Sequence, residues 1–195
     1  MKTGRPDQSL VVALPAGPAP VPAVPLDLQT LFKMHAGYVW NSLRRLGVRP
    51  ADLEDLTHDV FLQVHRHNGE FDSSRAVRPW LFGFAFRLAS QYRRRAFRRF
   101  EQPSEVEAAV DPAPSPERDA QTADELRLVR EALATVPLER RAVFVLYAID
   151  GARVDEIAET LRIPVNTVYS RLRTARIEFN AAIERLARKG VRREP

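Results

Sequence analysis

A tight corner at residues 162–164 constrains the fold of this chain more than any other feature. Before the corner, apolar residues recur at helical spacing over 154–161, which predicts a short amphipathic helix. Pro164 cannot continue that helix, because it lacks an N–H group and clashes with the preceding turn. A second helix follows, with a predicted buried face that consists of Val168, Leu172 and Ala175. Two helices joined by so short a corner predict a helix-turn-helix.

The opposite face of the second helix carries side chains that form hydrogen bonds. Asn166, Ser170 and Arg173 lie there, with Tyr169 and Thr174 flanking them. A recognition helix presents such side chains to base edges in the major groove of duplex DNA. The segment therefore predicts a reader of double-stranded DNA.

Composition supports a helical protein with a polyanionic partner. Of the 195 residues 45% are hydrophobic, glycine is scarce, and the formal net charge is +5 with a pI of about 10.1. The chain has no cysteine, which excludes disulfides and thiolate metal sites. No apolar run approaches the ~20 residues that span a bilayer, and the short run after Ser9 is broken by Pro15. We expect a cytoplasmic protein without membrane insertion.

The chain divides into four parts by composition. Residues 1–26 contain six prolines and predict a disordered tail, whereas 27–100 read as a first helical domain. Residues 101–123 contain six acidic residues, one basic residue and four prolines, which predicts a flexible acidic linker. Residues 124–190 read as a second helical domain that includes the helix-turn-helix. The predicted fold class is all-α, with two small helical domains.

Three helices are predicted in the first domain. The first runs from Leu28 to Leu46 and ends near Gly47, and the second runs over 52–64 with Asp52 able to cap its start. A loop is predicted from residue 68 to 77, followed by a third helix that begins near Pro79. Phe84 and Trp80 are predicted to lie in the core, whereas the pattern leaves Phe82 and Phe86 undecided.

The third helix ends in a run of arginines that can neutralise several phosphates of a nucleic acid. The same residues could instead form a solvated helix end that favours cations. Aromatic residues beside such arginines can stack on unpaired bases, although most would fill a core. The run consists of Arg93, Arg94, Arg95, Arg98 and Arg99.

The second helix is acidic at its start, with Asp52, Glu54, Asp55 and Asp59. The helix dipole favours such residues, and they could also dock a basic protein surface. His58 and His65 could share a helix face with two of these carboxylates, but nothing else suggests a metal site. No catalytic constellation and no glycine-rich phosphate loop are evident, so we expect neither an enzyme nor a cofactor or metal.

The order of these motifs is more specific than any one of them. The acidic Asp-Leu-Glu-Asp-Leu-Thr-His-Asp-Val-Phe helix precedes Pro-Trp-Leu-Phe-Gly-Phe-Ala and the arginine run, and an acidic linker leads to Val-Pro-Leu-Glu-Arg-Arg, Asp-Glu-Ile-Ala and the recognition helix. Over residues 28–188 this order resembles the extracytoplasmic-function sigma factors, the smallest sigma-70 family subunits of bacterial RNA polymerase. Phe86-Arg87, Gln91 and His65 depart from the residues usual in that family.

The resemblance implies a factor that binds core polymerase, recognises and opens promoters, and starts transcription. Its first domain would be sigma region 2, which contacts the clamp helices of the largest polymerase subunit. The matching residues are Asp55, His58, Asp59, Phe61 and Leu62. The linker would run through the RNA-exit path, and an anti-sigma factor would be a further partner.

The resemblance also implies two DNA contacts. Region 2 would hold the melted −10 element by a flipped base and by backbone contacts. The implied residues are Ser74, Arg75, Arg78, Trp80, Arg93, Arg94, Arg95 and Arg98. The second domain, sigma region 4, would read the −35 element. Its candidate residues are Asn166, Thr167, Tyr169, Ser170, Arg171, Arg173 and Arg176, of which Arg171 and Arg176 are expected to contact phosphate or pair within the protein.

Three other classes of protein compete with this interpretation. A conventional helix-turn-helix repressor or activator would bind a palindrome as a dimer, but it leaves the acidic helix and the arginine run unexplained. A recombinase would need a nucleophile with supporting arginines or a carboxylate metal cluster, and no convincing set is present. An inhibitor that occupies polymerase without DNA would not need an intact recognition helix.

Overall fold

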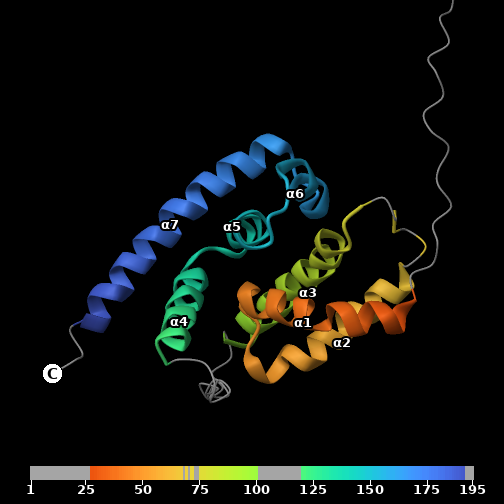
Figure 1. The fold of residues 1–195 in the computed structure, drawn as a ribbon, viewed down its shortest axis with the longest axis horizontal. Coiled ribbons are helices and arrows are strands. Elements are labelled where there is room, and N and C mark those ends of the chain that lie inside the picture. The colour runs from red at the N-terminus through yellow and green to blue at the C-terminus, as the bar shows by residue number, and fades with distance from the viewer. Residues whose placement is uncertain (1–26, 68, 70, 73–74, 101–119, 192–195) are drawn as a thin grey trace, which may run out of the picture.

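The computed structural model describes residues 27–191 apart from residues 68, 70, 73–74 and 101–119 (Figure 1). Across these described ranges the secondary structure is helical and contains no strand, which confirms the predicted all-α class. The tail predicted over 1–26 and most of the linker predicted over 101–123 lie outside the described residues.

The first unit is a group of three helices that pack against one another. They are α1 (Leu28–Leu46), α2 (Leu53–Arg66) and α3 (Val77–Phe100), with the short 3-10 turn η1 (Pro50–Asp52) before α2. The Asp27 carboxylate accepts hydrogen bonds from two N–H groups in the first turn of α1, and Gly47 ends that helix with φ +94°. Both ends of α1 therefore follow the sequence prediction.

The start of α2 corrects one detail. The Asp52 carboxylate makes no capping hydrogen bond to the helix. It accepts instead from the Tyr92 hydroxyl at 2.6 Å and from the Arg49 Nε at 3.0 Å. Asp52 thus ties the η1 turn to α3, a long-range role that local sequence spacing does not reveal.

The second unit consists of four helices and a π-helical turn. They are α4 (Ala120–Thr135), α5 (Leu138–Phe144), the π-helical η3 (Val145–Ile149), α6 (Val154–Leu161) and α7 (Val165–Val191). The long α7 packs against α4, α5 and α6 (Figure 1). It continues well past residue 176, where the predicted recognition segment ended, and α4 begins inside the range predicted as linker.

One apolar core includes residues of both units, because α3 packs against α1 and α2 and also against α6. Phe82 is completely buried there and Phe84 is nearly so, whereas Trp80 and Phe86 are only partly buried. The undecided Phe82 is therefore a core residue. A helix that is covered on two sides buries residues that lie off its main apolar stripe.

Candidate nucleic-acid and polymerase interfaces

The helix-turn-helix has the predicted geometry. On α7 the side chains of Val168, Leu172 and Ala175 are buried against the rest of the second unit, as the spacing predicted. Ile157 and Ala158 are buried under α6, so both helices of the motif are fixed to the second unit. Burial of one face leaves the other face of the first turns of α7 available for a partner.

The exposed face of α7 carries the predicted base-reading residues. Asn166, Ser170 and Arg173 are exposed, and Tyr169 retains 58% of its accessible surface. Two of the remaining −35 candidates, Thr167 and Arg171, are partly buried. The predicted −35 residues thus lie together at one end of α7, although the helix itself is much longer.

Two of the −35 candidates on α7 make contacts within the protein that bear on their roles. The Ser170 hydroxyl donates to the Thr167 carbonyl at 3.0 Å, so its oxygen remains available as an acceptor. The Arg176 guanidinium lies 5.2 Å from the centre of the Tyr147 ring. Arg176 therefore has an internal partner, one of the two roles expected for it, while its side chain stays exposed.

The corner of the motif contains a backbone conformation that is unusual for its residue. Arg162 has φ +53° and ψ +49° and is the one non-glycine residue with positive φ in the described part of the chain. Glycine is the usual residue at such a helix end, and a side chain there costs about 1 kcal/mol or more. The Arg162 and Ile163 N–H groups donate to carbonyls of α6, which holds the corner in place.

The −10 candidates near the start of α3 are engaged with the rest of the chain. Arg75 forms ion pairs with Asp72 at 3.1 Å and with Glu159 of α6 at 2.7 Å. Arg78 lies with its guanidinium 5.5 Å from the centre of the Tyr38 ring. Ser74 lies outside the described residues.

The aromatic candidates form a continuous row. Trp80 packs at 4.7 Å from Phe71 and at 5.2 Å from Phe84, measured between ring centres. The row ends at Arg87, whose guanidinium lies 4.4 Å from the centre of the Phe84 ring. Phe71 and Phe84 are buried, so of these rings only the partly exposed Trp80 has surface for a base.

The arginine run begins as predicted. Arg93, Arg94 and Arg95 are exposed on α3. The side chains of Arg98 and Arg99 lie outside the described part of the structure.

The acidic surface of α2 is the candidate for binding a protein. Asp55, His58 and Asp59 are exposed, and Leu62 retains 54% of its accessible surface. A single exposed leucine is common on protein surfaces, so the gathered carboxylates are the feature that suits a basic protein partner.

Phe61 does not belong to this surface. It is only 4% exposed, and its ring packs at 4.8 Å from that of Phe32 in the core. Phe61, predicted to bind polymerase, is therefore not exposed in this arrangement, because α2 turns this position towards α1. The His58 ring stacks on the Phe32 ring, with ring centres 5.9 Å apart.

The two units meet at a polar contact on the α1 side. The Tyr38 hydroxyl donates to the Asp150 carboxylate at 2.7 Å, and Arg45 lies 3.7 Å from the same carboxylate. Burial raises the pKa of Asp150, against the opposing effects of the Tyr38 hydrogen bond and the Arg45 charge. Burial and the nearby Asp150 charge also raise the pKa of Tyr38, which therefore stays a hydrogen-bond donor.

Arg141 is a buried cation that joins carbonyls of both units. It is 2% exposed and donates to the Val136 and Ala134 carbonyls beyond and at the end of α4, and to the Arg45 carbonyl of α1 at 3.4 Å. Burial lowers the pKa of Arg141 to about 10, so it remains charged at neutral pH. Carbonyls at helix ends stabilise a cation, which explains a buried arginine in this place.

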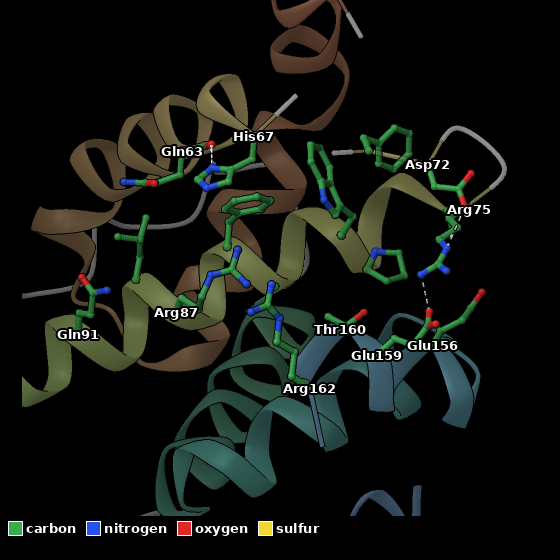
Figure 2. Close-up of a pocket in the computed structure, with 17 residues that line it drawn as sticks. Gln63, His67, Asp72, Arg75, Arg87, Gln91, Glu156, Glu159, Thr160 and Arg162 are labelled. Atoms are coloured by element: carbon green, nitrogen blue, oxygen red, sulfur yellow. Dashed lines mark hydrogen bonds and ion pairs between the residues drawn. The ribbon is translucent and has the colours of Figure 1, made fainter. Parts of the chain in front are cut away.

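A cavity of about 880 Å³ separates the units on the other side (Figure 2). It is lined by the end of α2, by residues just before α3, by α3 from Pro79 to Gln91, and by α6 with the following Arg162. Next to it α6 approaches α3 closely, because a Cβ on Gly83 would lie 3.4 Å from the Thr160 carbonyl oxygen. The described residues contain no cluster of metal-ligating side chains and no helix long and apolar enough to cross a membrane.

Comparisons with known proteins assign both units. The family model for sigma-70 region 2 matches residues 31–99, and that for sigma-70 region 4 matches residues 126–178. The ECF RNA polymerase sigma factor SigL of Mycobacterium tuberculosis is 32% identical over 155 residues, which cover 76% of this chain and 84% of that protein. RNA polymerase sigma factor NccH of Alcaligenes xylosoxydans xylosoxydans is 28% identical over 159 residues, or 79% and 85% of the two chains.

The chain belongs to the extracytoplasmic-function sigma factors. It is thus a sigma factor of RNA polymerase and acts in promoter-directed transcription initiation. The acidic helix and the arginine run, which a conventional repressor leaves unexplained, both fall within sigma region 2.

Solved sigma factors share the fold of this sigma factor. RpoE of Bartonella quintana, solved with the anti-sigma factor NepR, has a TM-score of 0.66 at 18% identity and covers 81% of this chain and 97% of its own. CnrH in complex with the cytosolic domain of CnrY has a TM-score of 0.58 at 24% identity, over 80% and 87% of the two chains. At these identities the likeness concerns the fold.

Sequence reasoning missed the residues through which regions 2 and 4 of the sigma factor touch. Tyr38, Asp150, Arg141 and Glu159 carry these contacts. Asp150 and Glu159 are 112 and 84 positions from their partners, so no local periodicity connects them. A buried arginine can be found only once its neighbours in space are known.

Proposed function

We propose that this sigma factor reads its −35 element with the start of α7. The carrying observation is the exposed face of the helix-turn-helix, where Asn166, Tyr169, Ser170 and Arg173 lie above a buried face. Arg173 and Asn166 can form paired hydrogen bonds with guanine and adenine edges. Thr167, Arg171 and Arg176 would hold the DNA backbone, where positive charge matters more than base identity.

The acidic face of α2 serves as the contact with core polymerase in this proposal. Asp55, His58, Asp59 and Leu62 offer a basic partner both charge complementarity and an apolar contact. The same carboxylates repel DNA, which keeps this helix out of the grooves. The clamp helices of the largest polymerase subunit are the proposed partner.

The start of α3 and its arginine run take the melted −10 strand. Trp80 offers a partly exposed ring to an unstacked base, and Arg93, Arg94 and Arg95 offer charge to the backbone. Ser74 and Arg98 belong to the same proposed surface. Arg75 and Arg78 join it only after they leave Glu159 and Tyr38.

Release of Arg75 from Glu159 requires regions 2 and 4 to separate. Region 4 covers part of the −10 surface through α6, so promoter opening needs α6 to leave α3. Core polymerase would hold the regions apart at the spacing of the two promoter elements, and the tether between them would then raise the effective concentration of each for its DNA site. The proposed parts are a tail over 1–26, region 2 over 27–100, a linker over 101–123 and region 4 over 124–190.

An anti-sigma factor is a further proposed partner of this chain. The related factors CnrH and RpoE were solved with CnrY and NepR, which supports a protein anti-sigma factor as a partner of this chain too. The chain acts by binding and not as an enzyme, and its place of action is the cytoplasm, where promoters lie.

Run-off transcription tests the proposed function. Purified bacterial core polymerase is combined with a library of promoter fragments, with and without the full-length protein. New start sites that share a −35 and a −10 sequence are the expected result. DNA binding without co-purification with core polymerase, and without new start sites, would contradict the proposal and favour a repressor or activator.

A further inference from the structure

The cavity between α3 and α6 has a polar end and an aromatic side (Figure 2). At the polar end Arg75 pairs with Asp72 and Glu159, and the Glu156 carboxylate accepts from the Arg153 N–H at 2.9 Å. These charged groups are engaged within the chain. A further occupant of the cavity is therefore expected on its aromatic side.

The aromatic side is built around one ring near the start of α3. Trp80 lines the cavity and is partly exposed, and its ring lies 4.7 Å from that of Phe71 and 5.2 Å from that of Phe84, measured between ring centres. Phe71 and Phe84 are buried, so they are a fixed support for the indole. A supported, partly exposed indole is a flat apolar surface of the kind against which proline rings pack.

The chain itself contains a proline-rich segment that suits such a surface. Residues 15–25 read Pro-Ala-Gly-Pro-Ala-Pro-Val-Pro-Ala-Val-Pro and include no charged side chain. Proline fixes φ at about −65°, which favours the polyproline II helix with about three residues per turn. Pro22 and Pro25 therefore fall on one side of such a helix, as do Pro15 and Pro18. Aromatic-lined grooves recognise prolines at this spacing.

Residues 15–25 join the fold beside the cavity. The helices α1 and α2 pack against one another and are connected by a short turn, so they run in opposite directions (Figure 1). The start of α1 at Leu28 therefore lies beside the end of α2, where Gln63 and His67 line the cavity. Polyproline II extends about 3.1 Å per residue, so a segment of this length that begins at α1 can cross the cavity.

We propose that residues 15–25 bind in this cavity as a polyproline II segment, with their prolines packed on Trp80. The amide groups of Gln63 and Gln91, which also line the cavity (Figure 2), offer donors to the backbone carbonyls of the segment. A polyproline II helix leaves these carbonyls without internal hydrogen bonds. The tether to α1 gives the segment a high effective concentration at the cavity, so modest contacts suffice for binding.

The bound segment would stabilise the closed arrangement of the two regions. The cavity lies between α3 of region 2 and α6 of region 4, so a segment that contacts both walls favours the form in which they are packed together. The segment would also cover Trp80, which is the ring offered to the melted −10 strand. The resulting opposition to promoter opening rests on the proposed function, whereas the binding of the segment does not.

NMR of the isotope-enriched full-length protein tests this proposal through its two tryptophans, Trp40 and Trp80. Each indole N–H gives one signal, and Trp80→Phe identifies the signal that belongs to Trp80. Pro22→Ala combined with Pro25→Ala should shift the Trp80 signal and leave the Trp40 signal in place, because the proline rings are removed from the indole surface. The matched control Pro6→Ala, outside the segment, should shift neither signal. An unchanged Trp80 signal in the double variant would overturn the proposal.

A spin label distinguishes the segment of the same chain from other occupants. Because the chain has no cysteine, Ala23→Cys provides a single attachment site. A nitroxide there should broaden the Trp80 signal more than the Trp40 signal, and Pro22→Ala with Pro25→Ala should restore the Trp80 signal. Equal broadening of both indoles, or no recovery, would contradict binding in the cavity.

A mixture of two protein samples tests whether the segment comes from a second copy. Spin-labelled protein without isotope enrichment is mixed with enriched protein without a label. We expect no broadening of the Trp80 signal in this mixture, and broadening there would overturn the proposal and assign the occupant to a second copy. None of these signals requires polymerase or DNA, so their failure and the failure of the proposed function can be told apart.

Discussion

The two proposed DNA surfaces of this sigma factor differ in what their side chains do within the free chain. On α7, Asn166, Tyr169 and Arg173 face away from the protein. At the start of α3, by contrast, Arg75 is paired with Glu159 and Arg78 lies on Tyr38. One surface is ready for duplex DNA, and part of the other is covered by α6. The arrangement thus permits −35 binding before −10 binding.

The α3 surface is covered only if regions 2 and 4 pack together in the free chain. Substitution of Arg141 tests this packing and has the largest effect that we expect. Arg141→Met removes hydrogen bonds to carbonyls of both regions and leaves those carbonyls buried. We expect the free energy of unfolding to fall by about 3 kcal/mol, measured by urea denaturation. The exposed control Arg127→Met on α4 should change it by less than about 0.5 kcal/mol. Equal small losses in both variants would show that Arg141 does not join the regions.

Arg173→Ala tests whether the exposed face of α7 reads bases of the −35 element. If Arg173 reads a base, the variant should lose about 1–3 kcal/mol of DNA-binding free energy at one −35 position and tolerate other bases there. Binding to a set of duplexes with single substitutions, measured by fluorescence anisotropy, gives the answer. Uniform weakening across all duplexes would instead identify a phosphate contact.

Glu159→Gln tests whether α6 covers the surface at the start of α3, and its expected effect is smaller. The substitution removes the ion pair with Arg75, whose side chains are both more than half exposed, so it should shift the equilibrium between closed and open forms by at most about 1 kcal/mol. A shift of about 1 kcal/mol changes an equilibrium constant about fivefold, so run-off transcription at limiting sigma factor should rise by up to about that factor. Glu184→Gln, which removes an exposed pair within α7, should leave transcription unchanged. A fall in transcription with Glu159→Gln would contradict the covering role of this contact.

Acid should act weakly through His35, a partly buried residue of α1 whose pKa is affected by the charge of Arg78. Burial and the Arg78 charge lower the pKa of His35 below its ordinary value of 6.5, so the folded protein holds it neutral. Its contribution to stability is therefore complete above pH 6.5 and decreases as the pH falls below that value, because the unfolded chain takes up the proton first. An NMR titration of the His35 ring should give a midpoint below 6.5, and a midpoint at or above that value would refute the assignment.

Local rules predicted the parts of this fold that neighbouring residues decide. Apolar spacing placed the start of α1 at Leu28, Gly47 marked its end, and Pro164 marked the corner of the helix-turn-helix, because spacing and breakers act locally. The buried face of α7 followed from its spacing in the same way. The candidate −35 residues lie on the opposite face, where five of the seven are exposed, and their role in reading DNA stays a prediction.

Long-range packing decided what the sequence could not. Phe61 looked like part of an acidic contact surface, but Phe32 draws it into the core. Phe82 lay off the apolar stripe, yet α6 covers the side of α3 that would otherwise be open. Asp52 leaves the helix it was expected to cap because Tyr92 offers a hydrogen bond from α3. Each case depends on a partner that lies far away along the chain.

A reversible cross-link between α3 and α6 tests whether region 4 must leave region 2 before transcription starts. Gly83 and Thr160 face one another across the contact, because a Cβ on Gly83 would lie 3.6 Å from Thr160 Cγ2, and the chain has no cysteine of its own. The protein with Gly83→Cys and Thr160→Cys is compared in run-off transcription before and after reduction, with each single variant as a control. We expect that the oxidised protein binds a −35 duplex normally but does not start transcription, and that reduction restores initiation. Equal initiation by the oxidised and reduced forms would contradict it.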